Sequence, residues 1–278
     1  MRIFKRSTAV LLILAAILFL LFSVLGSHEV PVLMYHFIGS RAEAIDHGLL
    51  VSNDTFKQQL EWLKRWGYHV YSLDELYDIK TERNRHYQKG VVLTFDDGSK
   101  SFLKEVVPLL NSEQIPAASF LIWNNVLKEE KGSMSLAEIK SLMQNPWVTF
   151  GVHTVHHKVL VNLSDEELEE EIVQSKRNFE SVFQMPMLYF AYPGGYFDDL
   201  SLTKVREAGY HLAFTTARRR LEGQPETLHS LVRVKITEKD ANEFLFWLKA
   251  SGTYTLLKKW KWQVINHVPP TDYTTPLD

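Results

Sequence analysis

Short apolar runs alternate with amphipathic stretches along most of the chain. The apolar run at 91–95 is rich in β-branched residues and too short for a helix, so it predicts a buried strand. In the stretches at 52–66 and 164–183, apolar residues recur at helical spacing instead. The expected strands are 31–36, 69–71, 91–95, 117–123, 147–152, 188–191, 211–215 and 231–236. The expected helices are 52–66, 73–79, 100–110, 135–143, 164–183, 199–208 and 240–249.

This alternation predicts an α/β fold with a parallel sheet. Seven to eight strands favour a distorted (β/α) barrel over an open sheet with helices on both faces. Ser135 with Glu138, and Ser164 with Glu167, form capping boxes that predict where two of the helices begin. The polar stretches at 39–50 and 81–89 are expected to be loops.

The N-terminus carries a targeting signal. Arg2, Lys5 and Arg6 precede an apolar helix at 9–25, so residues 1–27 are expected to be a signal peptide or a membrane anchor. No Ala-x-Ala cleavage site follows, which favours the anchor slightly. Positive charge before the run places the rest of the chain outside the membrane. We therefore expect an extracytoplasmic protein, either membrane-anchored or secreted.

Composition narrows the chemistry. The 278 residues fit one large α/β domain, here 28–278. There is no cysteine, which excludes disulfides, thiolate metal sites and cysteine nucleophiles. Removing the three N-terminal cations leaves 28 of the 31 basic residues against 33 acidic ones, so nothing supports binding to nucleic acid.

Two adjacent carboxylates, Asp96 and Asp97, follow the apolar strand at 91–95, and Gly98 comes next. Strand ends of this kind carry the chemistry of parallel α/β folds. Adjacent carboxylates repel, so they need either a cation or different roles. A metal ligand beside a general base satisfies both demands. The alternative is an ordinary Asp-Asp-Gly turn.

His153 and His157 are four residues apart, which places them on the same side of a helix or of a strand. Two histidines and one carboxylate make a three-ligand site typical of hydrolytic zinc centres. Surface histidines would give the same spacing. His156 breaks the spacing and is expected outside the ligand set.

Two further polar clusters follow predicted strands. The turn Tyr192-Pro193-Gly194-Gly195 could present backbone N–H groups to an oxyanion, or be a simple tight turn. His36 ends the first predicted strand. It is either a catalytic residue or an ordinary histidine of the core. In a parallel barrel all these strand ends meet on one face.

These residues resemble the motifs of the polysaccharide deacetylases, the NodB-homology family of carbohydrate esterases also called family 4. The resemblance lies in Thr94-Phe95-Asp96-Asp97-Gly98, in His153-Thr154-x-x-His157 and, partially, in the turn at 193–195. It implies that Asp97, His153 and His157 hold one divalent metal, most often Zn²⁺. Asp96 would be the general base acting on the attacking water, and the Gly194 N–H, with Tyr192 and Pro193 beside it, would contact the substrate oxyanion.

The chain departs from the family pattern in two places. Ala191 stands where the family usually has an arginine that pairs with the base, unless another cation such as Arg233 substitutes. The usual C-terminal Leu-x-His motif is missing, and residues 234–237 occupy its place. In both departures, the chain resembles the poly-N-acetylglucosamine deacetylases of biofilm systems. On that resemblance His36 is the general acid that protonates the leaving amine.

The resemblance implies a metal-dependent hydrolase that removes N-acetyl groups from a β-linked N-acetylglucosamine polysaccharide. Poly-N-acetylglucosamine ranks first, followed by peptidoglycan or chitin-like oligomers. One alternative is a non-catalytic carbohydrate-binding protein on the same fold, but the retained Asp96 disfavours it. Another is an amidase for small cyclic amides, which would need no export signal. Trp123, Tyr192, Tyr196 and Phe197 lie near strand ends and either line a sugar groove or pack in the core.

Overall fold

The computed structural model describes residues 30–40, 48–82, 87–216 and 226–266. The predicted signal peptide or anchor at 1–27 lies outside the described residues, and so does its boundary with the domain at 28–278. Within these ranges, no helix is both long enough and apolar enough to cross a bilayer.

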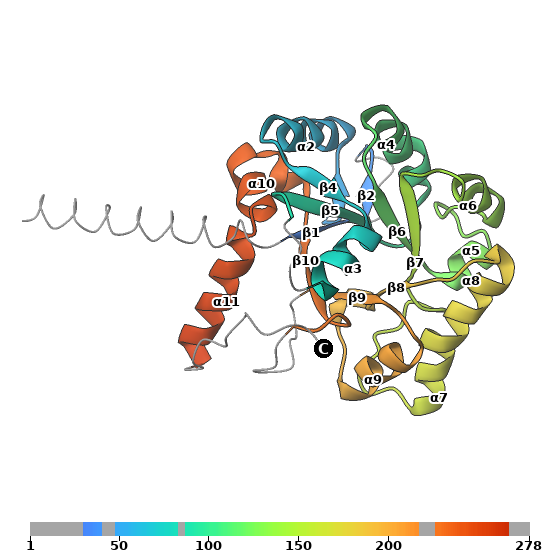
Figure 1. The fold of residues 1–278 in the computed structure, drawn as a ribbon. Coiled ribbons are helices and arrows are strands. Elements are labelled where there is room, and N and C mark those ends of the chain that lie inside the picture. The colour runs from blue at the N-terminus through green and yellow to red at the C-terminus, as the bar shows by residue number, and fades with distance from the viewer. Residues whose placement is uncertain (1–29, 41–47, 83–86, 217–225, 267–278) are drawn as a thin grey trace, which may run out of the picture.

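The strands form a closed, parallel barrel (Figure 1). Their order is β1-β10-β9-β8-β7-β6-β5, and pairing of β1 with β5 closes the ring, while β4 adds an eighth strand beside β5. The barrel strands are β1 (Val32–Tyr35), β5 (Gly90–Phe95), β6 (Ala117–Leu121), β7 (Val148–Val152), β8 (Tyr189–Ala191), β9 (Leu212–Thr215) and β10 (Leu231–Lys235), and the extra strand is β4 (His69–Tyr71). The predicted (β/α) barrel is confirmed.

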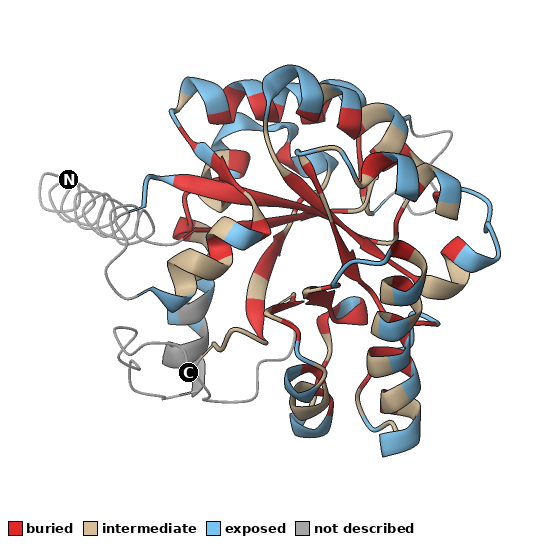
Figure 2. Ribbon diagram, turned by 45° about the vertical axis from the view of Figure 1, so that its right-hand side comes forward, coloured by how far each residue is buried: buried red, intermediate tan, exposed pale blue. Residues whose placement is uncertain are grey.

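Helices surround the barrel, and most of them bury one face against it (Figure 2). They are α2 (Asn53–Arg65), α3 (Leu73–Thr81), α4 (Val107–Glu113), α5 (Trp123–Leu127), α6 (Leu136–Leu142), α7 (Asp165–Leu168), α8 (Ser175–Phe183), α9 (Asp199–Glu207), α10 (Glu243–Ala250) and α11 (Thr253–Asn266). Two π-helical turns, η1 (Phe102–Val106) and η2 (Glu169–Gln174), lie in the helices that follow β5 and β7.

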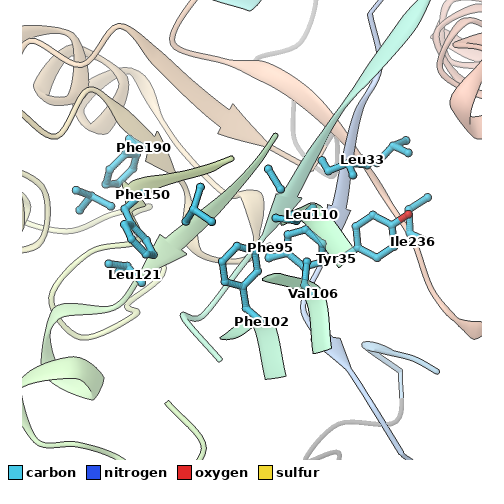
Figure 3. Packing of buried hydrophobic residues seen from close by; sticks show 14 of the residues in the cluster. Leu33, Tyr35, Phe95, Phe102, Val106, Leu110, Leu121, Phe150, Phe190 and Ile236 are labelled. Atoms are coloured by element: carbon cyan, nitrogen blue, oxygen red, sulfur yellow. The ribbon is translucent and has the colours of Figure 1, made fainter. Parts of the chain in front are cut away.

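Alternation along the strands divides the core in two. Outward-facing residues such as Tyr35 and Phe95 pack under the helices, where their rings stack with centroids 5.1 Å apart and Phe102 joins them (Figure 3). Inward-facing residues such as Phe120 and Phe214 fill the barrel, with ring centroids 5.6 Å apart. The barrel is therefore a packed core, like other barrels of its size.

Helix α3 covers the end of the barrel where the strands begin (Figure 1). Its buried Leu73 and Leu76 pack with Tyr189 and Leu212 from the first residues of β8 and β9. The Tyr189 hydroxyl also donates a hydrogen bond to Asp74. The opposite end, where the strands finish, is left for the site.

Most predicted elements are present, and the capping boxes at Ser135 and Ser164 are confirmed. Two expectations were wrong, and one helix was not predicted. The predicted loop at 39–50 ends in β3 (Leu50–Val51), which pairs with β2 (Phe37–Ile38). The predicted strand at 117–123 ends at Leu121, because Trp123 begins α5. No pattern predicted α11.

Candidate active site

The polar residues singled out in the sequence lie at the same end of the barrel. His36 follows β1, Asp96 and Asp97 follow β5, His153 and His157 follow β7, and the Gly194 turn follows β8. Parallel pairing brings these strand ends together on one face.

Asp96 lies on the inward-facing line of β5, and its side chain is 3% exposed. Its backbone N–H donates to the Tyr35 carbonyl over 3.0 Å, which extends the pairing of β5 with β1. Arg233 from β10 grips the carboxylate with two bonds, Nη1 to Oδ1 at 2.6 Å and Nη2 to Oδ2 at 2.7 Å. Such a bidentate pair is short, charge-assisted and fixed in orientation.

Arg233 is itself buried inside the barrel. Its guanidinium carbon lies 5.3 Å from the Phe120 ring centroid and 5.9 Å from that of Phe214. Arg233, which the sequence offered as one example of a cation that substitutes for the arginine absent at Ala191, is the partner of Asp96 in the structure. Burial alone would raise the pKa of the Asp96 carboxyl, but Arg233, with smaller contributions from the histidines of the site, holds it well below its usual range.

Asp97 has a left-handed backbone, with φ at 69°, which turns its carboxylate away from that of Asp96 and toward the β7 loop. Its Oδ1 lies 3.7 Å from His153 Nε2 and 3.6 Å from His157 Nε2. This oxygen is buried and accepts no hydrogen bond within the described part of the chain, although the side chain is 37% exposed. Burial raises the pKa of Asp97, and the charge of Asp96 adds to the effect.

His153 is fixed in a single tautomer. Its Nδ1 lies 2.6 Å from the Ala191 carbonyl, which can only accept, so Nδ1 carries the proton. Nε2 therefore presents its lone pair toward Asp97. Burial lowers the pKa of His153 to about 3, which keeps the ring neutral and suited to bind a metal.

His157 completes the set from the far end of the same loop. Its ring meets that of His153 edge to face, with centroids 4.8 Å apart, and remains 44% exposed. Burial lowers its pKa as well. Its backbone has φ at 59°, and its N–H donates to Thr154 Oγ1 over 2.9 Å.

The residues fit a divalent metal. One ligand atom each from Asp97, His153 and His157 lies within 4.8 Å of the others. Two neutral imidazole nitrogens and an unpartnered carboxylate oxygen face one point, a donor set that suits Zn²⁺ with a position left for water. Without a cation, the buried Asp97 oxygen would have no hydrogen-bond donor in the described residues.

His36 approaches the site from β1. Its Nε2 lies 3.8 Å from Asp96 Oδ2, and its side chain is 16% exposed. Its Nδ1 is buried and has no hydrogen-bond partner in the described ranges. The ring therefore stands beside the carboxylate and is only slightly exposed.

In the turn after β8, Gly194 is exposed to solvent, whereas Tyr192 and Pro193 are buried. Gly194 has φ at 63°, and a side chain at Gly195 would collide with Thr216. Pro193 is buried, and the Tyr192 ring is fully buried with its hydroxyl donating to the His229 carbonyl. Of the two alternatives for the Tyr192 ring, a sugar groove or core packing, the structure shows core packing, because the ring is buried and its hydroxyl is bonded.

Two of the other aromatic residues also pack in the core. Trp123 meets Phe179 edge to face at 5.0 Å, and Phe197 stacks on Tyr192 at 5.0 Å. Tyr196 keeps partial exposure and lies against Gly194. Of the four aromatics proposed for a sugar groove, Tyr196 alone combines exposure with a place at the Gly194 turn.

The sequence did not reveal Glu171, which lies in η2 and is fully buried. Its carboxylate accepts the backbone N–H groups of Val155 and His156 and contacts His156 Nδ1 at 2.8 Å. The residue stands in the run Asp-Glu-Glu-Leu-Glu-Glu-Glu at 165–171, which reads as an exposed helix face. Only a capped helix was visible there, and the π-helical turn had no signal in the sequence.

A family model for polysaccharide deacetylase matches residues 83–213. This range includes both aspartates, both ligand histidines and the Gly194 turn, but neither His36 nor Arg233. A putative polysaccharide deacetylase, YxkH of Bacillus subtilis, is 26% identical over 75% of this chain and 72% of its own length. The peptidoglycan-N-acetylglucosamine deacetylase of Bacillus cereus is 32% identical, over 44% of this chain and 54% of that protein. The poly-beta-1,6-N-acetyl-D-glucosamine N-deacetylase of Staphylococcus aureus is 24% identical, over 59% of this chain and 60% of that protein.

Solved structures agree with the fold. The Streptococcus pyogenes deacetylase PplD in complex with acetate superposes with a TM-score of 0.66 at 28% identity, covering 75% of this chain and 92% of that one. IcaB from Ammonifex degensii also has a TM-score of 0.66, at 25% identity, covering 79% and 97%. The motifs, the barrel and these similarities agree: residues 83–213 match a polysaccharide deacetylase domain, and the similar proteins and structures are polysaccharide deacetylases, which are hydrolytic enzymes.

Proposed function

We propose that this chain is a metal-dependent N-deacetylase that hydrolyses the acetamide of a β-linked N-acetylglucosamine polysaccharide. The reaction breaks the amide C–N bond with water and yields acetate and a free amine on the sugar. Asp97, His153 and His157 would hold the metal, for which we propose Zn²⁺. Asp96 and His36 would move the protons.

The observation that carries the proposal is the different setting of two adjacent aspartates. Asp96 is gripped by Arg233 and kept ionised, whereas Asp97 faces two imidazole nitrogens with an oxygen that has no hydrogen-bond donor in the described residues. One carboxylate is thus prepared to accept a proton and the other to bind a cation. A protein that only bound metal or sugar would not need a buried, charge-paired Asp96.

The bound metal would polarise the acetamide carbonyl and lower the pKa of water. Asp96 would accept a proton from the attacking water, since its carboxylate remains ionised at neutral pH. His36, 3.8 Å from Asp96, would give a proton to the leaving nitrogen. The exposed Gly194 turn would offer its N–H to the developing oxyanion.

For the substrate we propose poly-N-acetylglucosamine first and peptidoglycan second. Support comes from the similarity to the Staphylococcus aureus deacetylase and to IcaB, and from His36 standing beside Asp96 at the end of β1. The alignment with the Bacillus cereus peptidoglycan deacetylase supports the second choice. We further propose that the apolar run at 9–25 targets the domain to the outer side of the membrane.

Acetate release from poly-N-acetylglucosamine, peptidoglycan and chitin oligomers tests the proposal, with zinc added or chelator present. Asp96→Asn is expected to lower release by roughly 10²–10⁴-fold while zinc binding persists, and His36→Ala to lower it by roughly 10²-fold. Thermal melts of both variants would confirm that they are folded, since Asp96→Asn leaves Arg233 without its counter-ion.

The outcomes separate the candidate functions. Loss in both variants supports the enzyme with both proton carriers. Loss in Asp96→Asn alone removes His36 from the acid role. No acetate from any polymer, with zinc and sugar both bound, would instead indicate a non-catalytic carbohydrate-binding protein.

A further inference from the structure

We infer that Glu171 is a positioning residue that holds the β7 loop, residues 153–157, in the conformation that binds the metal. The inference rests on the proposed metal site but not on the proposed reaction. Glu171 lies outside the motifs that led to the site, and it touches none of the three ligand side chains among its described hydrogen bonds and ion pairs.

Glu171 is fully buried, and a buried carboxylate is stable only with several partners. Among the described residues, the hydrogen bonds of its carboxylate all come from the β7 loop. Oε2 accepts the Val155 N–H at 3.1 Å and the His156 N–H at 2.9 Å, and Oε1 lies 2.8 Å from His156 Nδ1. The ammonium of Lys158, just after the loop, lies 3.7 Å away. The glutamate and the loop thus stabilise each other.

The loop needs such support because its backbone is strained. Thr154 and His157 have φ at 68° and 59°, in the left-handed region that residues with a Cβ rarely adopt. Such conformations persist only where the surroundings impose them. They give the turn that returns His157 toward His153 and Asp97.

The backbone of the loop forms hydrogen bonds with three neighbours: β6, α5 and Glu171. The N–H of His153 donates to Leu121 and that of His157 to Thr154 Oγ1. The carbonyls of Thr154 and Val155 accept from the first two residues of α5. Glu171 supplies the acceptor for the two N–H groups at the centre of the loop, Val155 and His156.

The helix geometry explains how an acidic residue reaches this place. The helix at 165–183 opens into the π-helical turn η2 at 169–174, which widens the turn that carries Glu171. Its acidic neighbours at 165–167, 169 and 170 stay exposed or half-buried, while Glu171 is buried. Single π-helical turns of this kind often lie at functional sites.

The expected consequence is a loss of metal affinity without loss of the chemistry. If the loop is no longer held, part of the metal's binding free energy must order it. Loss of a residue that hydrogen-bonds a metal ligand typically weakens metal binding by roughly 10–100-fold, and we expect the same range for Glu171, which holds the loop that carries two of the three ligands. Acetate release at saturating zinc would remain close to that of the unmodified protein.

The test measures the zinc dissociation constant of Glu171→Gln by competition with a chromophoric chelator, together with the zinc dependence of acetate release. Glutamine keeps the size of the side chain but replaces one acceptor oxygen with a donor group. The matched control is Glu138→Gln, which removes an acid from a partly exposed capping box on α6. We expect roughly 10–100-fold weaker zinc binding for Glu171→Gln and less than about a 2-fold change for the control.

A second variant covers the case in which Glu171→Gln folds poorly. His156→Ala removes the ring contact but leaves the carboxylate its two backbone donors, so zinc binding should weaken only a few-fold. Unchanged zinc affinity in both variants, or lost acetate release at saturating zinc with unchanged affinity, would overturn the inference. Weakened zinc binding in a protein that releases no acetate would support the inference and contradict the proposed reaction instead.

Discussion

The two loops that build the site are held in opposite ways. The loop after β5 is fixed from inside the barrel, where Arg233 grips Asp96 between aromatic rings. The loop after β7 is fixed from outside, where Glu171 on the surrounding helix accepts its backbone N–H groups. We call Arg233 the interior anchor and Glu171 the exterior anchor. The interior anchor pairs with the charge of the Asp96 side chain, and the exterior anchor fixes the backbone conformation of the β7 loop.

The difference separates two properties that a metal hydrolase needs. The interior pair sets the ionisation of the proposed base, so damage there is expected to change the reaction more than metal binding. The exterior anchor sets the place of a metal ligand, so damage there is expected to change affinity more than the reaction. Variants at each anchor can therefore be told apart by measuring both properties.

The largest effect is expected from His153→Ala, because this ring serves both the proposed metal site and the hold on the β7 loop. It offers Nε2 to the metal site while Nδ1 ties the β7 loop to β8. We expect zinc binding to weaken by more than the roughly 10–100-fold predicted for Glu171→Gln, and acetate release to fall to background. Calorimetric zinc titration checks the first result; retained tight binding would show that the ion binds elsewhere.

Arg233→Ala should come next, since it leaves Asp96 buried without its counter-ion. Breaking a buried pair in this way costs about 3–5 kcal/mol of the free energy of unfolding, measurable by urea denaturation. The stability from Asp96 is present above its unfolded pKa and lost as pH falls through its lowered folded pKa, so the deficit should shrink in acid. Acetate release should fall more than zinc affinity.

A compensating change sharpens this prediction. Ala191 is the position where the resemblance to the family places an arginine, and it lies on β8, two strands from β10. The double variant Ala191→Arg with Arg233→Ala is expected to recover part of the lost activity and stability. Equal loss in the single and double variants would mean that only the β10 strand can present this cation to Asp96.

Metal removal gives a smaller, graded effect on stability. At a zinc concentration 100 times the dissociation constant, the ion should add about 2.7 kcal/mol to the free energy of unfolding. At the same zinc concentration, Glu171→Gln should lose about 1.3 kcal/mol of this if binding is tenfold weaker and about 2.3 kcal/mol if it is a hundredfold weaker. Melts with zinc and with chelator measure both numbers, and an equal zinc effect in the two proteins would contradict the role of the exterior anchor.

The smallest effect is expected from Glu138→Gln, outside both anchors. Burial alone would raise the pKa of Glu138, but bonds from Ser135 and the nearby Lys100 lower it. The carboxylate of Glu138 therefore stabilises the fold at a pH above its ordinary pKa of 4.5. This stabilisation is lost as the pH falls through the lowered pKa of the folded protein. Since the group is partly exposed, the loss should stay below about 1 kcal/mol near neutral pH. A larger loss would show that α6 also supports the site.

The parts of the fold that depend on neighbouring residues could be predicted from the sequence. The apolar run at 91–95 and the boxes at Ser135 and Ser164 are local patterns, and the structure has the predicted strand and helix starts there. Arg233 could be suggested as the partner of Asp96, because Ala191 stands where the family has the arginine that pairs with this carboxylate. Its placement depends on the ring closing between β1 and β5, which no local pattern shows.

What the sequence could not show depends on non-local packing. Glu171 is one acid in an acidic run, and only the π-helical turn distinguishes it from its exposed neighbours. The pairing of β2 with β3 involves two residues on each side, which is too short for a periodic signal. Tyr192 seemed placed for a ligand because it follows a strand, yet its hydroxyl bonds to a carbonyl across the core.

The cover that α3 forms over the far end of the barrel has a consequence for traffic through the site. Within the described residues, aromatic rings fill the interior and α3 covers the strand starts, so the barrel offers no passage from end to end. On the proposed function, a polymer lies across the open mouth rather than threading through it, and units in the middle of a chain are accessible. Acetate then leaves by the entrance that the polymer occupies, so the departure of acetate and the shift to the next sugar unit are linked events.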